Sequence, residues 1–351
     1  MTVTDLDSRR NSILQAVIEA YVETASPVGS ELIARKLRSS LSSATIRNIM
    51  GSLEEIGFLI QPHTSAGRVP TDRGYRFYVD AVMEAPQLPS EEFSRMAELV
   101  DPREIDLDQL LERASAILAE LTHEAAFAIV PTMKRSPVKQ VELVPISVRK
   151  VLCVLIANGE MIASHIVEIE QPMTRDEAAS LARFINMELV GLPFQELLES
   201  LERRMLGEAD SFYHFVKRSL DILQHALSTE PDERLFVDGA SYVVDQPEFH
   251  REPRRTYQFL KVLDAQEGLL ARIRQDLKGS GVRIRIGSEV QVPGLETCSY
   301  VMVPFIIGEQ VMGAVGVLGP TRMDYPRMSA CVEGMGRCLN DILNRLISSG
   351  S

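Results

Sequence analysis

The chain has 351 residues, which is too long for one average domain and predicts two or three. Hydrophobic residues make up 45% of the chain and charged residues 25%, a globular composition that excludes wholesale disorder. The formal net charge of −12 excludes a chain that is basic throughout, so any contact with nucleic acid has to be confined to one part of it.

The charge is unevenly distributed along the chain. Residues 1–80 carry nine basic and nine acidic side chains, so the remainder carries the whole net charge. Between residues 28 and 78 seven basic side chains stand against four acidic ones. This asymmetry is expected if only the N-terminal part meets phosphate.

The four cysteines stand at positions 153, 298, 331 and 338, without a CxxC pair or a histidine at ligand spacing. The pattern argues against a metal site or a disulfide framework and favours reduced thiols in the cytoplasm. Cys331 and Cys338 are expected to be buried as small hydrophobic residues. Because charged residues interrupt the first apolar run and no apolar stretch has membrane-spanning length, we expect neither a signal peptide nor a membrane span.

Three helices are predicted near the N-terminus. Apolar residues at helical spacing indicate a first helix over 8–23 and, after a break that contains proline and glycine, a second over 30–37. The third begins at Ser42 or Ser43, whose hydroxyl can accept a hydrogen bond from a free amide of the first turn. Gly57 ends it.

The third helix carries small and polar residues on the face opposite its apolar stripe. Small residues allow the helix backbone to approach a bulky ligand closely. Arg47 and Asn48 have the forked donors and acceptors that match guanine and adenine edges in a DNA major groove. We interpret it as a recognition helix, with an ordinary amphipathic helix as an equal alternative on this segment alone. Its expected DNA contacts are Ser43, Ala44, Thr45, Arg47, Asn48 and Gly51.

A two-stranded ribbon is predicted after this helix. Residues 58–60 suit a strand, Pro62 ends it because it lacks a ladder donor, Gly67 tolerates a positive φ, and Val69 resumes the extended chain. Recognition helix and ribbon together predict a winged helix-turn-helix, whose wing can bind phosphates or enter a minor groove. The expected wing contacts are His63, Thr64, Ser65, Gly67 and Arg68, and the weaker candidates for phosphate contacts are Ser30, Arg73 and Arg76.

The rest of the chain alternates helical and strand-like blocks. Thr71 caps a further helix, Pro86 and Pro89 mark a domain boundary, and a helical segment follows over 106–121. The first strands are predicted at 138–146, 148–157 and 161–169, the last two joined by a type I′ turn at Asn158-Gly159. A capping box at Thr174 and Glu177 opens a helical block that includes 194–205 and 212–227. Strands at 282–286, 300–307 and 311–318 and a helix over 325–347 complete the chain.

A helical block between two strand-rich blocks indicates an insertion into one antiparallel-sheet domain. We therefore predict a multidomain α+β protein. The expected divisions are a winged helix-turn-helix over 1–83, a linker over 84–90, a body over 91–170 and 257–351, and an insert over 171–256.

Five motifs resemble the heat-inducible transcription repressor family, HrcA. They are PVGS at 27–30, SSATIRN at 42–48, QPHTSAGRVPT at 61–71, GYRFYVD at 74–80 and GPTRMDY at 319–325. Because the motifs lie at both ends, the resemblance spans nearly the whole chain. One departure is Val290 after the sequence IGSE, where the family pattern leads us to expect asparagine.

The resemblance implies a homodimeric bacterial repressor that binds an inverted-repeat operator, called CIRCE, upstream of chaperone operons. It also implies a GAF-like body, a helical α/β insert that dimerises, and dependence on the GroE chaperonin, which heat would occupy with unfolded clients. It implies no cofactor.

Other functions are less well supported by the residues. The histidines have no carboxylates or nucleophiles at motif spacing, and no Lys-Ser/Thr follows Gly313, Gly316 and Gly319, so we expect neither an enzyme nor a phosphate-binding loop. Arg283 and Arg285 could line an anion pocket, although alternate charges on a strand more often face water. The alternative to a repressor of chaperone operons is a small-molecule-sensing regulator, which an open polar pocket in the body would favour and a closed apolar interior would oppose.

Overall fold

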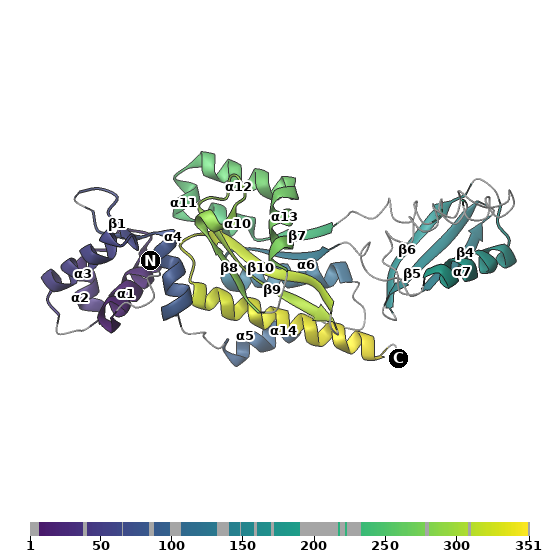
Figure 1. The fold of residues 1–351 in the computed structure, drawn as a ribbon, viewed down its shortest axis with the longest axis horizontal. Coiled ribbons are helices and arrows are strands. Elements are labelled where there is room, and N and C mark those ends of the chain that lie inside the picture. Colours follow the sequence, from purple (N-terminus) through teal and green to yellow (C-terminus); the bar gives the residue numbers. More distant parts are fainter. Residues whose placement is uncertain are drawn as a thin grey trace. The chain divides into compact units, whose positions relative to one another are not determined.

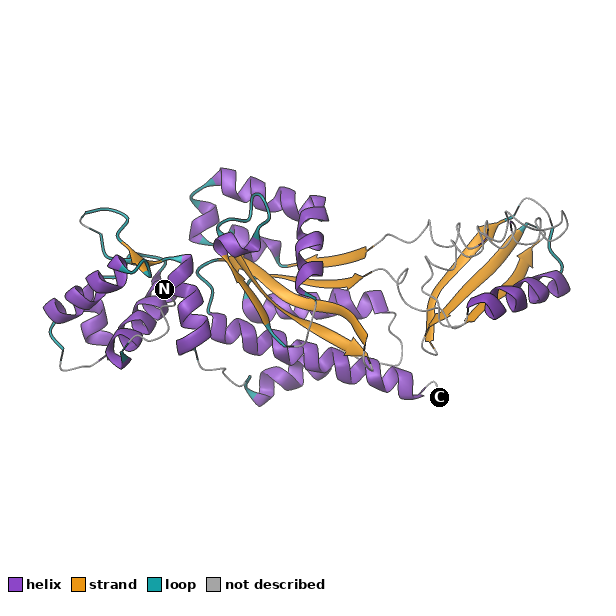
Figure 2. Cartoon of the chain, in the orientation of Figure 1, coloured by secondary structure: helices purple, strands orange, loops and turns teal. Residues whose placement is uncertain are grey.

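The chain forms two compact units, of which the first comprises Met1–Ile129 and Leu235–Ile342 and the second Val130–Arg234 and Leu343–Ser351. The second unit therefore interrupts the first in sequence. A computed structural model describes residues 7–37, 41–64, 66–83, 88–98, 107–131, 140–147, 149–157, 160–169, 172–189, 217, 222, 233–277, 281–307 and 310–349. Figures 1 and 2 show the helices and strands of both units.

The N-terminal part of the first unit, which we call the head, has the predicted three helices and ribbon. In order, its elements are α1 (Ser8–Thr24), α2 (Ser30–Leu37), α3 (Ser43–Glu55), β1 (Leu59–Ile60), β2 (Val69–Pro70), α4 (Asp72–Phe77) and a π-helical turn, η1 (Tyr78–Val82). Two predicted caps are confirmed: the Ser42 hydroxyl accepts from the Thr45 amide at 3.1 Å, and the Thr71 hydroxyl accepts from the Gly74 amide at 3.1 Å.

The ribbon is closed at its base by a third segment of chain. β1 and β2 pair antiparallel, and the backbones of Val28 and Arg68 exchange two hydrogen bonds of 2.9 Å. Gly67 is needed here for a reason other than the predicted one. Its φ is not positive, but an added Cβ would lie 2.4 Å from the carbonyl carbon and oxygen of Val28. The close approach of two backbones therefore requires the glycine.

The remainder of the first unit, which we call the body, is built on a five-stranded sheet. Its strand order is β7 (Glu233–Asp238), β3 (Ala125–Pro131), β10 (Gln310–Pro320), β9 (Cys298–Ile307) and β8 (Arg283–Ile286). β10 pairs antiparallel with β3 and β9, and β9 pairs antiparallel with β8.

Helices lie on both faces of this sheet (Figure 1). One apolar cluster joins the sheet residues Phe127, Tyr300 and Leu318 to Phe259 and Ile273, which lie on the helices of the same face. These helices are α10 (Ala240–Val244), α11 (Pro247–His250), α12 (Pro253–Ala265) and α13 (Glu267–Asp276).

The C-terminal helix α14 (Tyr325–Ser349) packs against the opposite face of the sheet. A Cβ on Gly336 would lie 2.4 Å from Val303, and the Asn340 side chain accepts from the Ile306 amide at 2.7 Å. The other body elements are α5 (Ser90–Glu98), α6 (Leu107–Thr122), which contacts β10, and the 3₁₀ turn η3 (Gly287–Val290). All four cysteines are free and buried, as expected for Cys331 and Cys338.

The second unit contains a three-stranded antiparallel sheet and one described helix. The strands are β4 (Gln140–Ser147), β5 (Lys150–Ala157) and β6 (Glu160–Glu168), and the helix is α7 (Arg175–Leu189). The Asn186 side chain fixes α7 on β4, because it accepts from the Val141 amide at 2.6 Å and donates to the Val141 carbonyl at 2.9 Å. The capping box of Thr174 and Glu177 is present. The expected turn at 158–159 and helices over 194–205 and 212–227 lie outside the described residues, apart from 217 and 222.

The division between body and insert differs from the expected one. The strands β4, β5 and β6 form a sheet of their own in the second unit, whereas residues 235–256 belong to the first, so the unit boundaries lie near 130 and 234 instead of 171 and 256. The strand that pairs with β10 is β3, which we had not predicted. Its apolar run is buried on both faces and shows no alternation, so its sequence does not separate it from the preceding helix.

Candidate nucleic-acid interface

The recognition helix α3 is amphipathic, as predicted. Ile46, Met50 and Leu53 are at most 1% exposed and pack into the head. The opposite face carries exposed Arg47 and Asn48. Ala44 and Thr45 are also exposed, whereas Ser43 and Gly51 are half-buried.

The outward face of α3 is unobstructed within the described residues. Arg47 has no hydrogen bond or ion pair among them, so its five donors are available to an acceptor outside the chain. A Cβ added to Gly51 would meet no atom within 4 Å. The helix thus presents a forked cation beside an exposed amide, on a surface that a large ligand can approach.

The wing loop is held in shape by a glutamine that the sequence did not single out. The Gln61 side chain donates to the carbonyls of Thr64 at 3.1 Å and Ala66 at 2.9 Å, and its backbone amide donates to Glu54 at 3.1 Å. His63 and Thr64 are exposed on the loop, while the predicted contact Ser65 lies outside the described residues. Gln61 itself carries no sequence signal of this role.

Arg68 stands at the base of the wing, not at its tip. Its guanidinium forms an ion pair with Glu54 of α3, with Nε–Oε2 and Nη2–Oε2 distances of 2.9 and 2.8 Å, and its side chain is 17% exposed. In the structure this arginine therefore ties the wing to the recognition helix, and its expected phosphate or minor-groove contact stays a prediction. Gly67 is half-buried beside it.

The three weaker candidates for phosphate contacts lie in different environments. Ser30 is only 6% exposed, which argues against a phosphate contact. Arg73 is exposed, and its guanidinium carbon lies 5.9 Å from the centre of the Phe58 ring. Arg76 is bonded to Glu289, Asp80 and the carbonyl of Ile284, so its donors serve the contact between head and body. Of the three, only Arg73 remains a candidate.

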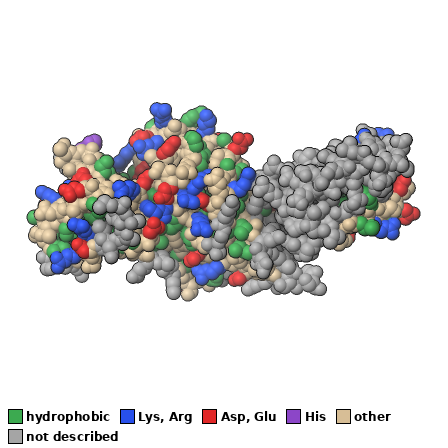
Figure 3. Space-filling view, viewed as in Figure 1, with side chains coloured by type: hydrophobic (Ala, Val, Ile, Leu, Met, Phe, Trp, Pro, Cys, Tyr) green, Lys and Arg blue, Asp and Glu red, His purple; other side chains and the backbone are tan. Residues whose placement is uncertain are grey.

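Basic and acidic side chains are interspersed on the described surface of the body that Figure 3 shows. Arg285, expected either to face water or to line an anion pocket, is bonded to Asp276, whose side chain is 5% exposed. Burial opposes ionisation of Asp276, but hydrogen bonds from Arg285 and from the Tyr300 hydroxyl hold the pKa of this carboxyl below its ordinary value. Arg283 and Arg285 both line a cavity of about 270 Å³, which Arg76 and Glu289 line as well.

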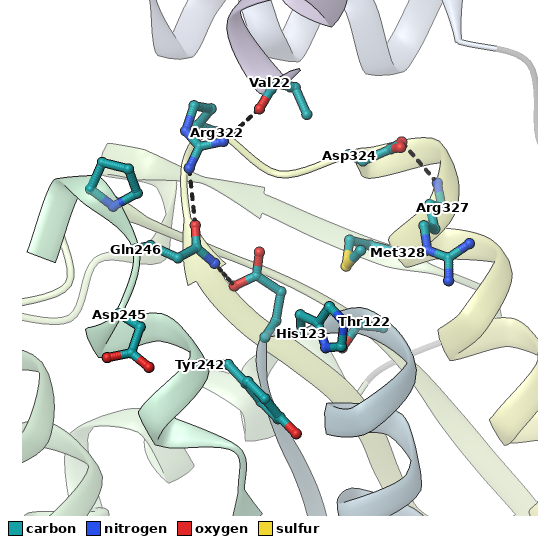
Figure 4. A pocket seen from close by; sticks show the side chains of 12 residues that line it. Val22, Thr122, His123, Tyr242, Asp245, Gln246, Arg322, Asp324, Arg327 and Met328 are labelled. Carbon is teal, nitrogen blue, oxygen red and sulfur yellow. Dashed lines mark hydrogen bonds between the residues drawn. The ribbon is translucent and has the colours of Figure 1, made fainter. Parts of the chain in front are cut away.

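An open cavity of about 610 Å³ is lined by residues that include His123, Gln246 and Arg322 (Figure 4). The buried carboxyl group of Glu124 lies beside it. Glu124 is 6% exposed, and burial raises its pKa to about 8. Gln246 donates to it at 2.8 Å and accepts from Arg322 at 3.2 Å. Arg322 in turn donates to the Val22 carbonyl of α1 at 2.6 Å, so the cavity borders the contact between body and head. Nothing in the spacing of these residues predicted the cluster.

Among the described residues, no group of His, Cys, Asp and Glu could hold a metal ion, and no helix is both long and apolar enough to cross a membrane. The three-helix head with its exposed recognition helix and wing defines a winged helix-turn-helix DNA-binding protein.

Comparison with known proteins identifies the family. Residues 5–81 match the family model for the "Winged helix-turn-helix transcription repressor, HrcA DNA-binding", and residues 108–328 match "HrcA protein C terminal domain". The chain belongs to the HrcA family of transcription repressors. Membership confirms the resemblance found in the motifs and the prediction of a non-enzymatic DNA-binding regulator.

Individual relatives match over almost their full length. The protein named heat-inducible transcription repressor HrcA from Moorella thermoacetica is 35% identical over 343 residues, which are 97% of this chain and 98% of that protein. The protein of the same name from Ruminiclostridium cellulolyticum is 33% identical over 98% of this chain and 99% of its own length. A crystal structure described as a hypothetical protein at 2.2 Å resolution shares the fold, with a TM-score of 0.59 and 22% identity over 97% of this chain and 100% of that chain.

Val290, where the resemblance led us to expect asparagine, is fully buried in the apolar cluster of the body. An apolar side chain suits this position, because an asparagine there would have to satisfy its amide inside the core.

Proposed function

We propose that this chain represses heat-shock chaperone operons by binding the inverted-repeat operator CIRCE as a homodimer. The observation that carries the proposal is the pair of exposed side chains, Arg47 and Asn48, on the outward face of α3. Arg47 and Asn48 read base edges in the major groove, while Ser43 and Thr45 contact phosphates. His63 and Thr64 of the wing, with Ser65, add backbone or minor-groove contacts.

A dimer matches an inverted repeat because each subunit presents one head to one half-site. We infer that the body is GAF-like and that the second unit is the dimerising insert. Support for the insert comes from large apolar side chains on its surface: Val144 is 45% exposed, Ile146 49% and Met187 81%. Apolar surface of this kind is commonly covered by a partner.

We further propose that the GroE chaperonin modulates the repressor. Apolar surface exposed when the dimer loosens gives a chaperonin a binding site, and heat withdraws the chaperonin by filling it with unfolded clients. Because the target is chromosomal DNA, the protein acts in the cytoplasm.

A competition gel shift tests the proposal. Purified full-length protein should bind labelled CIRCE and resist competition by unrelated DNA of the same length, and addition of chaperonin should increase the bound fraction. A single half-site should bind more weakly than the inverted repeat. Equal competition by unrelated DNA would contradict specific recognition of the operator. A bound fraction that does not change on addition of chaperonin would contradict modulation by GroE.

A second candidate function, small-molecule sensing, is favoured by the open cavity beside Glu124, whose lining includes the charged residues Asp245, Arg322 and Arg327. The interior of the body counts against it, because the space between the sheet and α10–α13 is filled by the buried apolar cluster. Operator binding measured with and without a metabolite extract separates the two functions. A sensor requires a change in affinity that dialysis reverses, whereas a repressor without an effector keeps the same affinity.

A further inference from the structure

The head is bonded to the body immediately after the wing. Arg76 of α4 forms a bidentate ion pair with Glu289 of η3, with Nε–Oε1 and Nη2–Oε2 distances of 2.9 and 2.5 Å. Arg76 also donates to the carbonyl of Ile284 on β8 at 2.7 Å. The two charged side chains are 28% and 31% exposed, so water screens this pair only in part.

One turn earlier on α4, Asp72 is held by the same loop of the body. Its carboxylate accepts from the amide of Ser288 at 2.9 Å and from the Ser288 hydroxyl at 3.1 Å. Gly287 allows this approach, because its φ is +53° and an added Cβ would lie 2.2 Å from Asp72 Oδ2. The loop at 287–289 thus fits the acidic start and the basic end of one short helix.

A second attachment lies at the C-terminal end of α1. Arg322 donates to the Val22 carbonyl and, at 3.2 Å, to the Gln246 side chain (Figure 4). Glu248 holds the same guanidinium at 2.5 and 3.2 Å. A cation is favoured at this end of a helix, where carbonyls lack partners within the helix. The rings of Tyr75 and Tyr325, both buried, lie 5.6 Å apart and join head to body as well.

The first attachment is rigidly linked to the recognition helix. The Thr71 hydroxyl, which caps α4, donates to the Gly57 carbonyl at 2.7 Å, just beyond the end of α3. Phe77 of α4 stacks on Phe58 with ring centres 4.8 Å apart. A rotation of α4 therefore carries α3 with it.

We propose that Asp72, Arg76, Glu289 and Arg322 form a head–body clamp that fixes the direction of the recognition helix and so determines which half-site spacing the dimer accepts. One attachment alone leaves the head free to rotate about it, whereas two attachments from different elements remove that freedom. The clamp residues are positioning residues and touch no DNA. The inference rests on the proposed binding of a dimer to an inverted repeat.

Operator spacing tests the clamp in the full-length protein. Wild type should bind the natural inverted repeat more tightly than one with half a helical turn, about 5 base pairs, inserted between the half-sites. Arg76→Gln and Glu289→Gln should reduce this preference by about five- to tenfold, the low end of the coupling between linked sites. Both variants should keep wild-type affinity for a single half-site. The charge-reversed pair Arg76→Glu with Glu289→Arg should restore much of the spacing preference.

Arg254→Gln is the matched control, because it removes the same charge from an exposed position on the body helix α12, without a bond to the head among the described residues. It should leave the spacing preference unchanged. Clamp variants that keep the full preference would overturn the inference. So would equal losses on the single half-site and the inverted repeat, since a direct DNA contact or misfolding causes that pattern.

A measurement without DNA separates failure of the clamp from failure of the proposed function. The described native cysteines are buried, so spin labels can be placed at Arg9→Cys in the head and Arg254→Cys in the body, both exposed positions. With labelled chains diluted by unlabelled ones, the distance distribution should be narrow in wild type and broad in Glu289→Gln. An equally narrow distribution in the variant contradicts the clamp whatever the protein binds.

Discussion

At the scale of single residues, the arginines of the head have different tasks, which depend on the partners that each one meets. Arg47 points outward without a partner among the described residues, Arg68 pairs with Glu54, and Arg76 pairs with Glu289. The partner of Arg68 lies 14 positions away in the sequence and the partner of Arg76 lies 213 positions away, so neither pairing can be read from neighbouring residues. Removal of Arg47 should therefore change DNA recognition and leave the fold intact.

Arg47→Ala should lower operator affinity by about 1–3 kcal/mol and relax discrimination at one base pair, because a bidentate contact to a base edge is lost. Affinities for operator variants that differ at each position provide the measurement. Arg254→Ala, which removes an exposed arginine from α12 in the body, is the control and should leave affinity and specificity unchanged. A folded Arg47→Ala protein with full operator preference would contradict the assignment of the recognition helix.

Glu124 makes stability depend on pH. Its pKa is about 8 in the folded chain against an ordinary value of 4.5, so the folded state keeps a proton that the unfolded state releases. The associated stability is fully present below pH 4.5 and is lost as pH rises towards 8. Glu124→Gln, which stays neutral, should be as stable as wild type near pH 4.5 and more stable near pH 8, by at most about 4 kcal/mol.

Urea denaturation of both proteins across this pH range measures the difference. Glu333→Gln is the matched control, because Glu333 is exposed on α14, and it should give the same stability difference from wild type at every pH. A constant difference for Glu124→Gln would show that its carboxyl group titrates normally in the folded protein.

At the scale of elements, the recognition helix and the wing act as one piece. Glu54 near the end of α3 accepts from the Gln61 backbone and pairs with Arg68, while the ribbon base is bonded to Val28. The position of the wing therefore depends on the contact between the backbones at Gly67 and Val28, which leaves no room for a side chain.

Gly67→Ala should destabilise the head by about 1–3 kcal/mol, because the added methyl group forces the two backbones apart. It should also weaken binding to specific and unrelated DNA alike by displacing the wing. Thermal unfolding and gel shifts measure the two effects. Gly29→Ala, where an added Cβ meets nothing within 4 Å, is the control and should have neither effect. A Gly67→Ala protein as stable as wild type would contradict this prediction, because it would show that the backbones at Gly67 and Val28 can move apart without loss of stability.

At the scale of the whole molecule, an acidic protein of net charge −12 binds an acidic polymer because its charge is divided between parts. The head is neutral to basic and the rest of the chain is acidic, so DNA should attract the head and repel the rest of the chain. The acidic remainder discourages non-specific wrapping and leaves binding to the head.

Operator affinity should fall steeply as salt rises, with a slope of about −0.9 in log affinity against log salt for each phosphate contact. Fluorescence anisotropy between about 50 and 200 mM KCl covers the informative range. Arg73→Gln should reduce the slope by about one contact if this exposed arginine holds a phosphate. A slope of zero for wild type would contradict phosphate binding by the head.

The sequence by itself determined the features that depend on neighbouring residues: the three helices of the head, the caps at Ser42 and Thr71, the ribbon, and the outward face of α3. Short-range hydrogen bonds and side-chain periodicity fix these features, and both can be read locally. Only the tertiary structure decided which sheet each strand joins, that Arg68 and Arg76 serve the fold, and that Glu124 is buried. These features depend on pairings between residues far apart in the chain, and an antiparallel strand or an arginine has the same local pattern whichever partner it meets.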